Sequence, residues 1–313
     1  MKRVAFMFPG QGSQTVGMGK SFYDNYPEIQ EMFHNADELL DEKISEIMFN
    51  GPQEKLTETE HAQPALLLSS IAVHTLLLKE EIIPVMAVGH SLGEYSALVA
   101  AGALALEDAI PLVNTRGRLM EKAFPKGKGA MAAVLGMNEE AITNTLGKLS
   151  TDEIVDIANI NCPGQIVISG SKEGIDQASE LLKENGAKRV LPLNVSGPFH
   201  SRLMKAANED FTDKLNQVHI NNANIPVFAN VTGNPETVSN AVKDLLIKQL
   251  YSPVRFEESI KNMLDEGVDA FVEVGNGKVL SGLVKKISRK TPTFAIQDPE
   301  SMEAFISWYK EES

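Results

Sequence analysis

The stretch Gly89-His90-Ser91-Leu92-Gly93 stands between a short apolar segment, residues 85–88, and a segment rich in alanine and leucine, residues 94–104. The first segment predicts a buried β-strand and the second a helix, so the stretch forms a sharp turn between them. A serine on such a turn has a strained backbone, and flanking side chains would clash with neighbouring backbone, which explains both glycines. The helix N-terminus points at the exposed hydroxyl and favours the negative charge that develops in acyl transfer. The pattern predicts Ser91 as a nucleophile; a tight turn that happens to contain serine is the alternative.

Short apolar strands alternate with helices in both directions from this turn. Residues 4–8 form an apolar strand that stops at the Pro-Gly-Gln-Gly turn of residues 9–12. A helix is expected at residues 108–124, and further strands at residues 226–231, 270–274 and 293–296. This order predicts an α/β fold with a doubly wound, mostly parallel sheet, similar to the core of an α/β-hydrolase.

The middle of the chain follows a different pattern, β-α-β-β-α-β, which is typical of a ferredoxin-like α+β unit. The expected elements are residues 130–135, 138–149, 154–159, 165–169, 173–185 and 188–193. We therefore expect a small ferredoxin-like subdomain, residues 126–196, inserted into a large catalytic subdomain of residues 1–125 and 197–313. The active site should lie in the cleft between the two.

The composition is that of an acidic globular protein. The chain has 313 residues, of which 43% are hydrophobic and 23% are charged, enough for a large packed core. A net charge of -13 argues against nucleic acid or an anionic membrane as the main partner, because both require a basic surface. The single cysteine, Cys162, excludes an internal disulfide and a CxxC metal site, and we expect no metal.

No segment of the sequence predicts membrane insertion. The longest apolar stretch, residues 64–78, contains Ser69, Ser70 and His74 and is too short to span a bilayer, so it is expected to be a buried helix. The apolar run at residues 4–8 is too short for a signal-peptide core. A cytoplasmic location is expected.

A serine hydroxyl is a weak nucleophile and needs a base, for which the chain offers six histidines. His200 lies in a Gly-Pro loop, residues 196–201, just after the inserted unit, and catalytic groups concentrate on loops at strand ends. His200 is therefore the favoured base. His90 adjoins Ser91 but is expected to point away from it, His74 is expected in the core, and the others lie in polar segments: His34, His61 and His219.

No Asp or Glu between Ser91 and His200 stands out as the group that orients the base. The order thus differs from that of the α/β-hydrolases, in which an acid falls between serine and histidine. Either the acid is unrecognised, or a neutral carbonyl group fixes the imidazole tautomer.

Three motifs occur here in the order and context of the malonyl/acyl transferase family: Phe-Pro-Gly-Gln-Gly-Ser-Gln at residues 8–14, Gly-His-Ser-Leu-Gly-Glu-Tyr at 89–95 and Gly-Pro-Phe-His-Ser at 197–201. Residues 116–120, 161–165 and 249–254 also resemble the family's patterns. The resemblance extends from residue 1 to about residue 299. Asn276 departs from it, because the family often has proline there.

This resemblance implies a role for each matching catalytic position. Ser91 is acylated and His200 is its base. The main-chain carbonyl of Gln249 holds His200, which accounts for the missing acid. The backbone N–H groups of Gln11 and Leu92 form the oxyanion hole.

The resemblance also implies a substrate site. Arg116 binds the free carboxylate of a malonyl group; the residues alone do not distinguish Arg116 from Arg118, since an arginine on a helix is often simply solvated. Met120 shares the helix face of Arg116. Asn161 and Gln165 shape the cleft from the small subdomain, and His90 and Phe199 complete the set.

The expected function is acyl transfer: malonyl moves from coenzyme A to the phosphopantetheine thiol of acyl carrier protein through a malonyl-serine intermediate, in fatty-acid biosynthesis. Malonyl-CoA and acyl carrier protein are the expected partners. No cofactor is required, because coenzyme A enters as part of the substrate. A serine hydrolase, such as a thioesterase acting on acyl-CoA, is the alternative enzyme, and a non-catalytic binding module is a third class.

Overall fold

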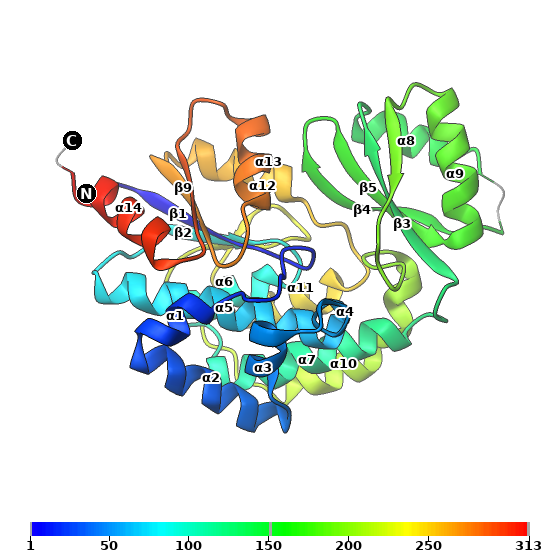
Figure 1. The fold of residues 1–313 in the computed structure, drawn as a ribbon. Coiled ribbons are helices and arrows are strands. Elements are labelled where there is room, and N and C mark those ends of the chain that lie inside the picture. Colours follow the sequence, from blue (N-terminus) through cyan, green and yellow to red (C-terminus); the bar gives the residue numbers. More distant parts are fainter. Residues whose placement is uncertain (1, 150–151, 312–313) are drawn as a thin grey trace.

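The computed structural model describes residues 2–149 and 152–311, which form a large part and a small part (Figure 1). The large part contains a six-stranded sheet of order β10-β9-β1-β2-β7-β8. Its strands are β1 (Val4–Phe8), β2 (Met86–Gly89), β7 (Val227–Phe228), β8 (Pro235–Glu236), β9 (Ala270–Val274) and β10 (Thr293–Ile296). All neighbouring strands are parallel except β7 and β8. The chain extends the sheet in both directions from β1, so the predicted doubly wound α/β fold is confirmed.

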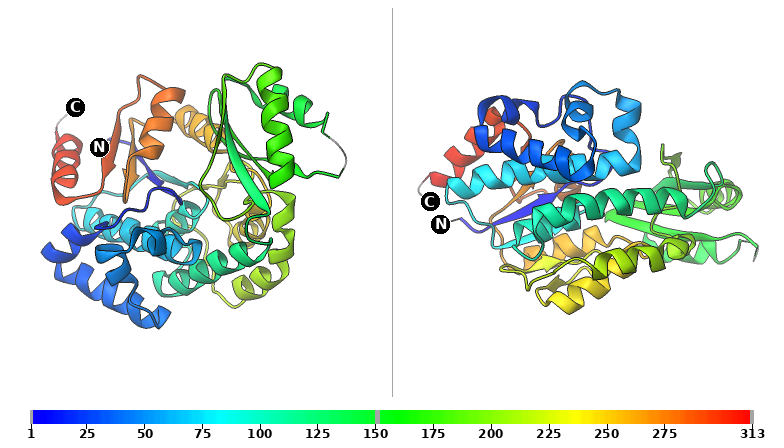
Figure 2. Two further views of the ribbon diagram at one scale, coloured as in Figure 1. Left: turned by 45° about the vertical axis from the view of Figure 1, so that its right-hand side comes forward. Right: turned by 90° about the horizontal axis from the view of Figure 1, so that it is seen from below.

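Helices cover both faces of this sheet (Figure 2). They are α1 (Lys20–Asn25), α2 (Pro27–Leu40), α3 (Ile44–Asn50), α4 (Gln53–Thr57), α5 (Thr59–Lys79), α6 (Gly93–Ala100), α7 (Leu106–Lys122), α10 (Asn208–Asn216), α11 (Ser239–Gln249), α12 (Phe256–Asp265), α13 (Val279–Ile287) and α14 (Pro299–Lys310), with a 3-10 turn, η1, at Arg202–Ala207.

Strand β1 is apolar throughout because the fold covers both of its faces. Val4, Phe6 and Phe8 belong to the core that includes α5 and α6, whereas Ala5 and Met7 belong to the core that includes α12 and α13. Because successive side chains point to opposite faces, a strand covered on both faces needs apolar residues at every position. All five are fully buried.

The small part has the predicted ferredoxin-like topology. Its strands are β3 (Gly129–Leu135), β4 (Val155–Cys162), β5 (Gln165–Ser171) and β6 (Arg189–Pro192), and its helices are α8 (Glu139–Leu146) and α9 (Lys172–Glu184). They form an antiparallel sheet of order β4-β5-β3-β6. Ala132 and Val134 of β3 pack with α8 and α9, whereas Met131 belongs to the core of the large part. One face of the small sheet is therefore directed at the large part.

Some predicted boundaries and environments were wrong. The strand expected at residues 226–231 is only Val227–Phe228, and the helix expected at 94–104 ends at Ala100. The apolar stretch 64–78 is a buried helix as predicted, but the helix, α5, is longer: its 21 residues are by length and composition sufficient to cross a membrane, and 89% of the apolar window is buried inside the fold. His61, expected in a polar segment and therefore at the surface, is buried on α5 and contacts Glu42.

The tight packing of the turn after β2 predicts a large effect of one methyl group. A Cβ at Gly93 would lie 2.0 Å from the carbonyl oxygen of Phe8, which is backbone and cannot move aside. We expect Gly93→Ala to lower the free energy of unfolding by about 3 kcal/mol. Gly282→Ala is the matched control, because nothing lies within 4 Å of a Cβ there. Because Gly282 lies within helix α13, Gly282→Ala should raise the free energy of unfolding by about 0.5 to 1 kcal/mol. Urea denaturation followed by circular dichroism measures both, and equal stability of the two variants would contradict the packing argument.

Candidate active site

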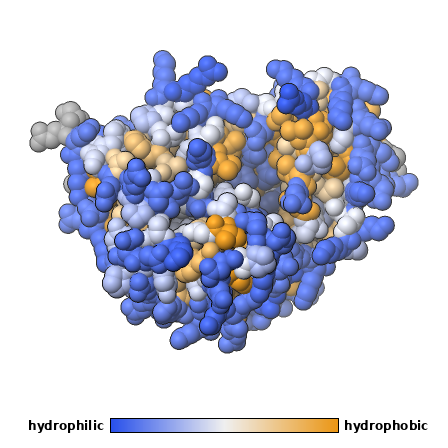
Figure 3. Space-filling view, viewed as in Figure 1, coloured by the Kyte–Doolittle hydropathy of each residue, from blue (hydrophilic) through white to orange (hydrophobic). Residues whose placement is uncertain are grey.

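Three loops that leave the carboxyl ends of neighbouring parallel strands form the centre of the site. The loop after β1 carries Gln11, the loop after β2 carries Ser91, and the loop after β7 carries Asn230. Sites of doubly wound sheets lie at this edge, beyond the carboxyl ends of the parallel strands. The site faces the small part across a hollow that is lined with hydrophobic surface on the small-part side (Figure 3).

Ser91 is held in the strained backbone that the sequence predicts. Its φ is 52°, in the left-handed region that a residue with a side chain seldom adopts. Asn230 secures this geometry: its Oδ1 accepts from the Ser91 N–H at 2.8 Å, and its Nδ2 donates to the Gly89 carbonyl at 2.6 Å. The absence of a side chain at Gly89 is necessary, because a Cβ there would lie 1.8 Å from the carbonyl carbon of Gly93.

His200 contacts both Ser91 and Gln249. The distance between His200 Nε2 and Ser91 Oγ is 2.8 Å, and His200 Nδ1 lies 2.8 Å from the main-chain oxygen of Gln249. Because a carbonyl can only accept, Nδ1 carries the proton, and Nε2 is left free to accept the Ser91 hydroxyl proton. Burial, and then the nearby positive charge of Arg116, lower the His200 pKa to about 3.

The guanidinium of Arg116 is fully buried beside Ser91. Its Nη1 donates to Gln63 Oε1 at 2.8 Å, and its Nη2 donates to Gln249 Oε1 at 2.9 Å and to Ser91 Oγ at 3.3 Å. Among the residues that the structure describes, no carboxylate forms an ion pair with this guanidinium. A buried charge with only neutral partners is costly, so the arrangement favours an anionic ligand next to Ser91.

A cavity of about 150 Å³ lies over Ser91. The predicted residues that line it are Gln11, His90, Ser91, Leu92, Arg116, Met120, Phe199 and His200. Within the described residues, the backbone N–H groups of Gln11 and Leu92 donate no hydrogen bond to a protein acceptor. Two such donors beside a nucleophile can stabilise an oxyanion.

The comparisons with known proteins agree on one family. The model of the acyl transferase domain matches residues 5–304. The chain is 53% identical over 314 residues to the malonyl CoA-acyl carrier protein transacylase of Bacillus subtilis, with 100% of this chain and 99% of that protein covered. The chain belongs to the acyl transferase family.

Two solved structures resemble this acyl transferase closely. An acyl carrier protein S-malonyltransferase from Vibrio cholerae has a TM-score of 0.95 and 42% identity, covering 97% of this chain and 100% of that one. A malonyl-transacylase in complex with a type II PKS acyl-carrier protein has a TM-score of 0.95 and 37% identity, covering 98% of this chain and 99% of that one.

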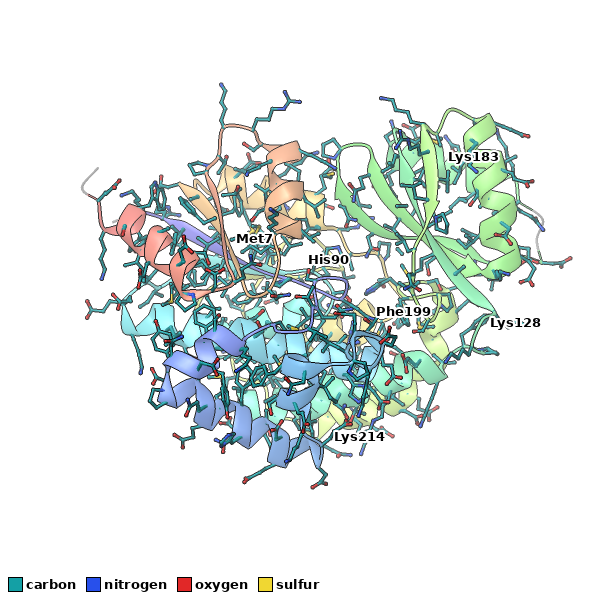
Figure 4. The ribbon with its side chains drawn as sticks, viewed as in Figure 1. Met7, His90, Lys128, Lys183, Phe199 and Lys214 are labelled. Atoms are coloured by element: carbon teal, nitrogen blue, oxygen red, sulfur yellow. The ribbon has the colours of Figure 1, made fainter. Side chains whose placement is uncertain are left out.

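Three predicted residues of the acyl transferase lie outside the cavity lining. Asn161 Oδ1 accepts from His90 Nε2 at 2.8 Å and thereby links the small part to the nucleophile turn. His90 and Phe199 lie near the junction of the two parts (Figure 4). Gln165 Oε1 accepts from the Nζ of Lys286, on α13, at 3.0 Å. Gln249 contacts Arg116 through its side-chain oxygen and His200 through its main-chain oxygen.

Sequence reasoning missed several residues around the cavity and the turn, among them Gln63, Met131, Asn159 and Asn230. Asn230 lies two residues after the end of β7, and a polar residue at the carboxyl end of a predicted strand is a signal that could have found it. Gln63 lies near the start of α5, just before the apolar stretch 64–78, and gives no such signal, because only the fold brings α5 to α7.

The buried environment of His200 predicts an unusual titration. We expect the ring to stay neutral far below the ordinary pKa of 6.5, because its pKa in the fold is about 3. The unfolded chain binds this proton near pH 6.5, so the stability contributed by the neutral ring is complete above pH 6.5 and is lost as the pH falls toward about 3. Nitrogen-15 NMR of the histidine rings during an acid titration measures the site directly.

A matched pair of variants isolates the cause. Arg116→Gln should raise the His200 pKa, because it removes the neighbouring positive charge. Arg118→Gln, on the same helix but with an exposed side chain, should leave it unchanged. A His200 ring that titrates near 6.5 in the unmodified protein, or that responds equally to both variants, would contradict this account.

Proposed function

We propose that this acyl transferase moves a malonyl group from coenzyme A to the phosphopantetheine thiol of acyl carrier protein, through a malonyl ester on Ser91, in fatty-acid biosynthesis. The full-length similarity to malonyl CoA-acyl carrier protein transacylases supports this assignment. The observation that carries it is the buried guanidinium of Arg116, 3.3 Å from the Ser91 hydroxyl and without an ion-pair partner in the described chain.

In the first half-reaction Ser91 attacks the thioester carbonyl of malonyl-CoA. His200 accepts the hydroxyl proton at Nε2 as the new C–O bond forms, and the Gln249 carbonyl holds the imidazolium at Nδ1. The N–H groups of Gln11 and Leu92 stabilise the oxyanion. When the C–S bond breaks, the thiolate of coenzyme A leaves with the proton from His200.

The second half-reaction runs the same steps in reverse. The carrier-protein thiol gives its proton to His200 and attacks the ester carbonyl, and the Ser91 oxygen leaves with the proton returned by His200. The neutral His200 ring thus accepts a proton in each half-reaction. Ping-pong transfer of this kind requires no resident cofactor, since phosphopantetheine belongs to the substrates.

Arg116 selects the malonyl group. Its guanidinium offers parallel N–H donors that fit both oxygens of the free carboxylate. Met120 and Phe199 are apolar walls of the cavity. Asn161 holds His90 in place, and Gln165 links the small part to α13 through Lys286.

The proposed boundaries follow from the two sheets. Residues 126–196 form the small subdomain, and residues 1–125 and 197–313 form the large one, with the active site in the cleft between them. The reaction takes place in the cytoplasm, where both substrates of this pathway are expected. A serine hydrolase would need no buried arginine for a substrate carboxylate, so the site favours the transferase.

The role of Arg116 predicts a change in substrate preference. Arg116→Ala should cost about 3 kcal/mol for malonyl transfer, as for truncation of one partner of a buried charge pair. Acetyl transfer should hold or improve, because no unpaired cation is then buried against a neutral acyl group. Arg116→Lys should recover only part of the malonyl activity, because an ammonium cannot bind bidentately. The measurement is kcat/KM for malonyl-CoA and acetyl-CoA in parallel.

Arg118→Ala is the matched control and should leave both values unchanged, because its side chain is about half exposed on the same helix. Circular dichroism checks that each variant is folded. An equal loss for both substrates in Arg116→Ala would make Arg116 a structural residue and would remove the physical support for malonyl.

A further inference from the structure

The carboxyl group of Glu94 is buried directly behind the nucleophile turn. Glu94 is the second residue of α6 and is 3% exposed. Its Oε2 accepts from Gln249 Nε2 at 2.7 Å and from the backbone N–H of Asn230 at 3.1 Å. The transfer steps above do not use this carboxyl group, although ionising a buried carboxyl is costly without compensation.

The side-chain amide of Gln249 can have only one orientation here. Its Nε2 faces three oxygen acceptors: Glu94 Oε2, the Ser91 carbonyl at 3.0 Å and Asn230 Oδ1 at 3.2 Å. The reversed amide would set an oxygen against these oxygens and an NH₂ group against the guanidinium of Arg116. The amide oxygen is therefore directed at Arg116 Nη2, at 2.9 Å.

Glu94 and Arg116 thus form a charge pair with an amide between them. The carboxylate accepts from the amide nitrogen, and the amide oxygen accepts from the guanidinium. Each charge acts on the other, although they are not in contact. A direct ion pair would occupy the guanidinium edge that faces Ser91. The bridged pair balances the charge of Arg116 and leaves that edge open to a ligand.

We propose that Glu94 is ionised while the site holds no malonyl group, and that it takes up a proton from solvent when the malonyl carboxylate comes to Arg116; this inference rests on the proposed function. One guanidinium balances one buried anion, and a second carboxylate nearby is repelled by the first. Glu94 thereby tunes selectivity through Gln249 and Arg116 as a positioning residue that does not touch the substrate.

The titration of Glu94 falls in a range where it can be observed. Burial raises its pKa to about 7, and the donors from Asn230 and Gln249 and the charge of Arg116 oppose that rise. The groups that face it keep their state near neutral pH. Burial lowers the pKa of His90 and His200 and raises that of Tyr95, so these three are neutral, and Arg116 stays charged. Gln63 on α5 has no charge to change.

The test is the ratio of kcat/KM for malonyl-CoA to that for acetyl-CoA, measured from about pH 6 to about pH 8.5. Steps common to both substrates cancel in this ratio. In the unmodified enzyme the ratio should rise as the pH falls through the Glu94 pKa, because neutral Glu94 no longer repels the malonyl carboxylate. Glu94→Gln should show no pH step and should hold the ratio about tenfold above that of the unmodified enzyme at high pH.

Two further variants separate charge from structure. Glu273→Gln is the matched control, because Glu273 is also a buried carboxyl, which accepts from the N–H groups of Leu280 and Ser281 at the start of α13. It should leave the ratio unchanged. Glu94→Asp keeps the charge and should keep the pH step. If Glu94→Gln does not fold, the pH dependence of the ratio in Glu94→Asp tests the inference instead.

Infrared spectroscopy gives an independent readout. Malonylation of Ser91 near pH 8 should produce the absorption of a newly protonated carboxyl group, which acetylation and the Glu94→Gln variant should lack. An unmodified enzyme with no pH step in the ratio, or a Glu94→Gln variant that loses activity equally with both substrates, would overturn the inference. If Arg116→Ala removes the malonyl preference while the pH step is absent, only the Glu94 inference fails. If Arg116→Ala leaves the preference intact, the role that the proposed function gives to Arg116 fails as well.

Discussion

The guanidinium of Arg116 must be kept charged inside the protein, beside the nucleophile, without a direct carboxylate partner. Two glutamine side chains meet it, Gln63 from α5 and Gln249 from the end of α11. The same Gln249 holds His200 through its main-chain oxygen and contacts the Ser91 carbonyl through its amide. Arg116, His200 and the turn that carries Ser91 thus all contact this one residue, and displacement of α11 would disturb all three.

The small part contributes polar and apolar contacts to the site, whereas the charged group, Arg116, comes from the large part. His90, on the nucleophile turn, donates to Asn161 of β4, so the two parts meet at the turn itself. Met131 of β3 lines the cavity from the opposite side. In the proposed reaction an apolar wall on this side would limit the access of water to the acyl group, which would strengthen the electrostatic effect of Arg116 and disfavour hydrolysis of a serine ester.

Local patterns were sufficient to predict the fold and the nucleophile turn. Strand β1 is apolar because both of its faces are covered, and the glycines around Ser91 are required by close backbone contacts, so each leaves a signal in the sequence. Contacts between distant segments leave no such signal. Gln63 meets Arg116 only because α5 packs against α7, and the choice of Arg116 over Arg118 rested on family resemblance. For α5 the sequence predicted burial correctly, but it did not give the helix's length of 21 residues.

The most direct test of the account is the mass of the intact protein after mixing with malonyl-CoA. We predict an increase of one malonyl group, located on Ser91 by peptide mapping and removed when acyl carrier protein with its phosphopantetheine thiol is added. Ser91→Ala should gain no mass, and His200→Ala should gain it slower by about two to four orders of magnitude. An unmodified protein that stays unlabelled, or that loses the label to water as fast as to the carrier protein, would contradict the proposed transfer.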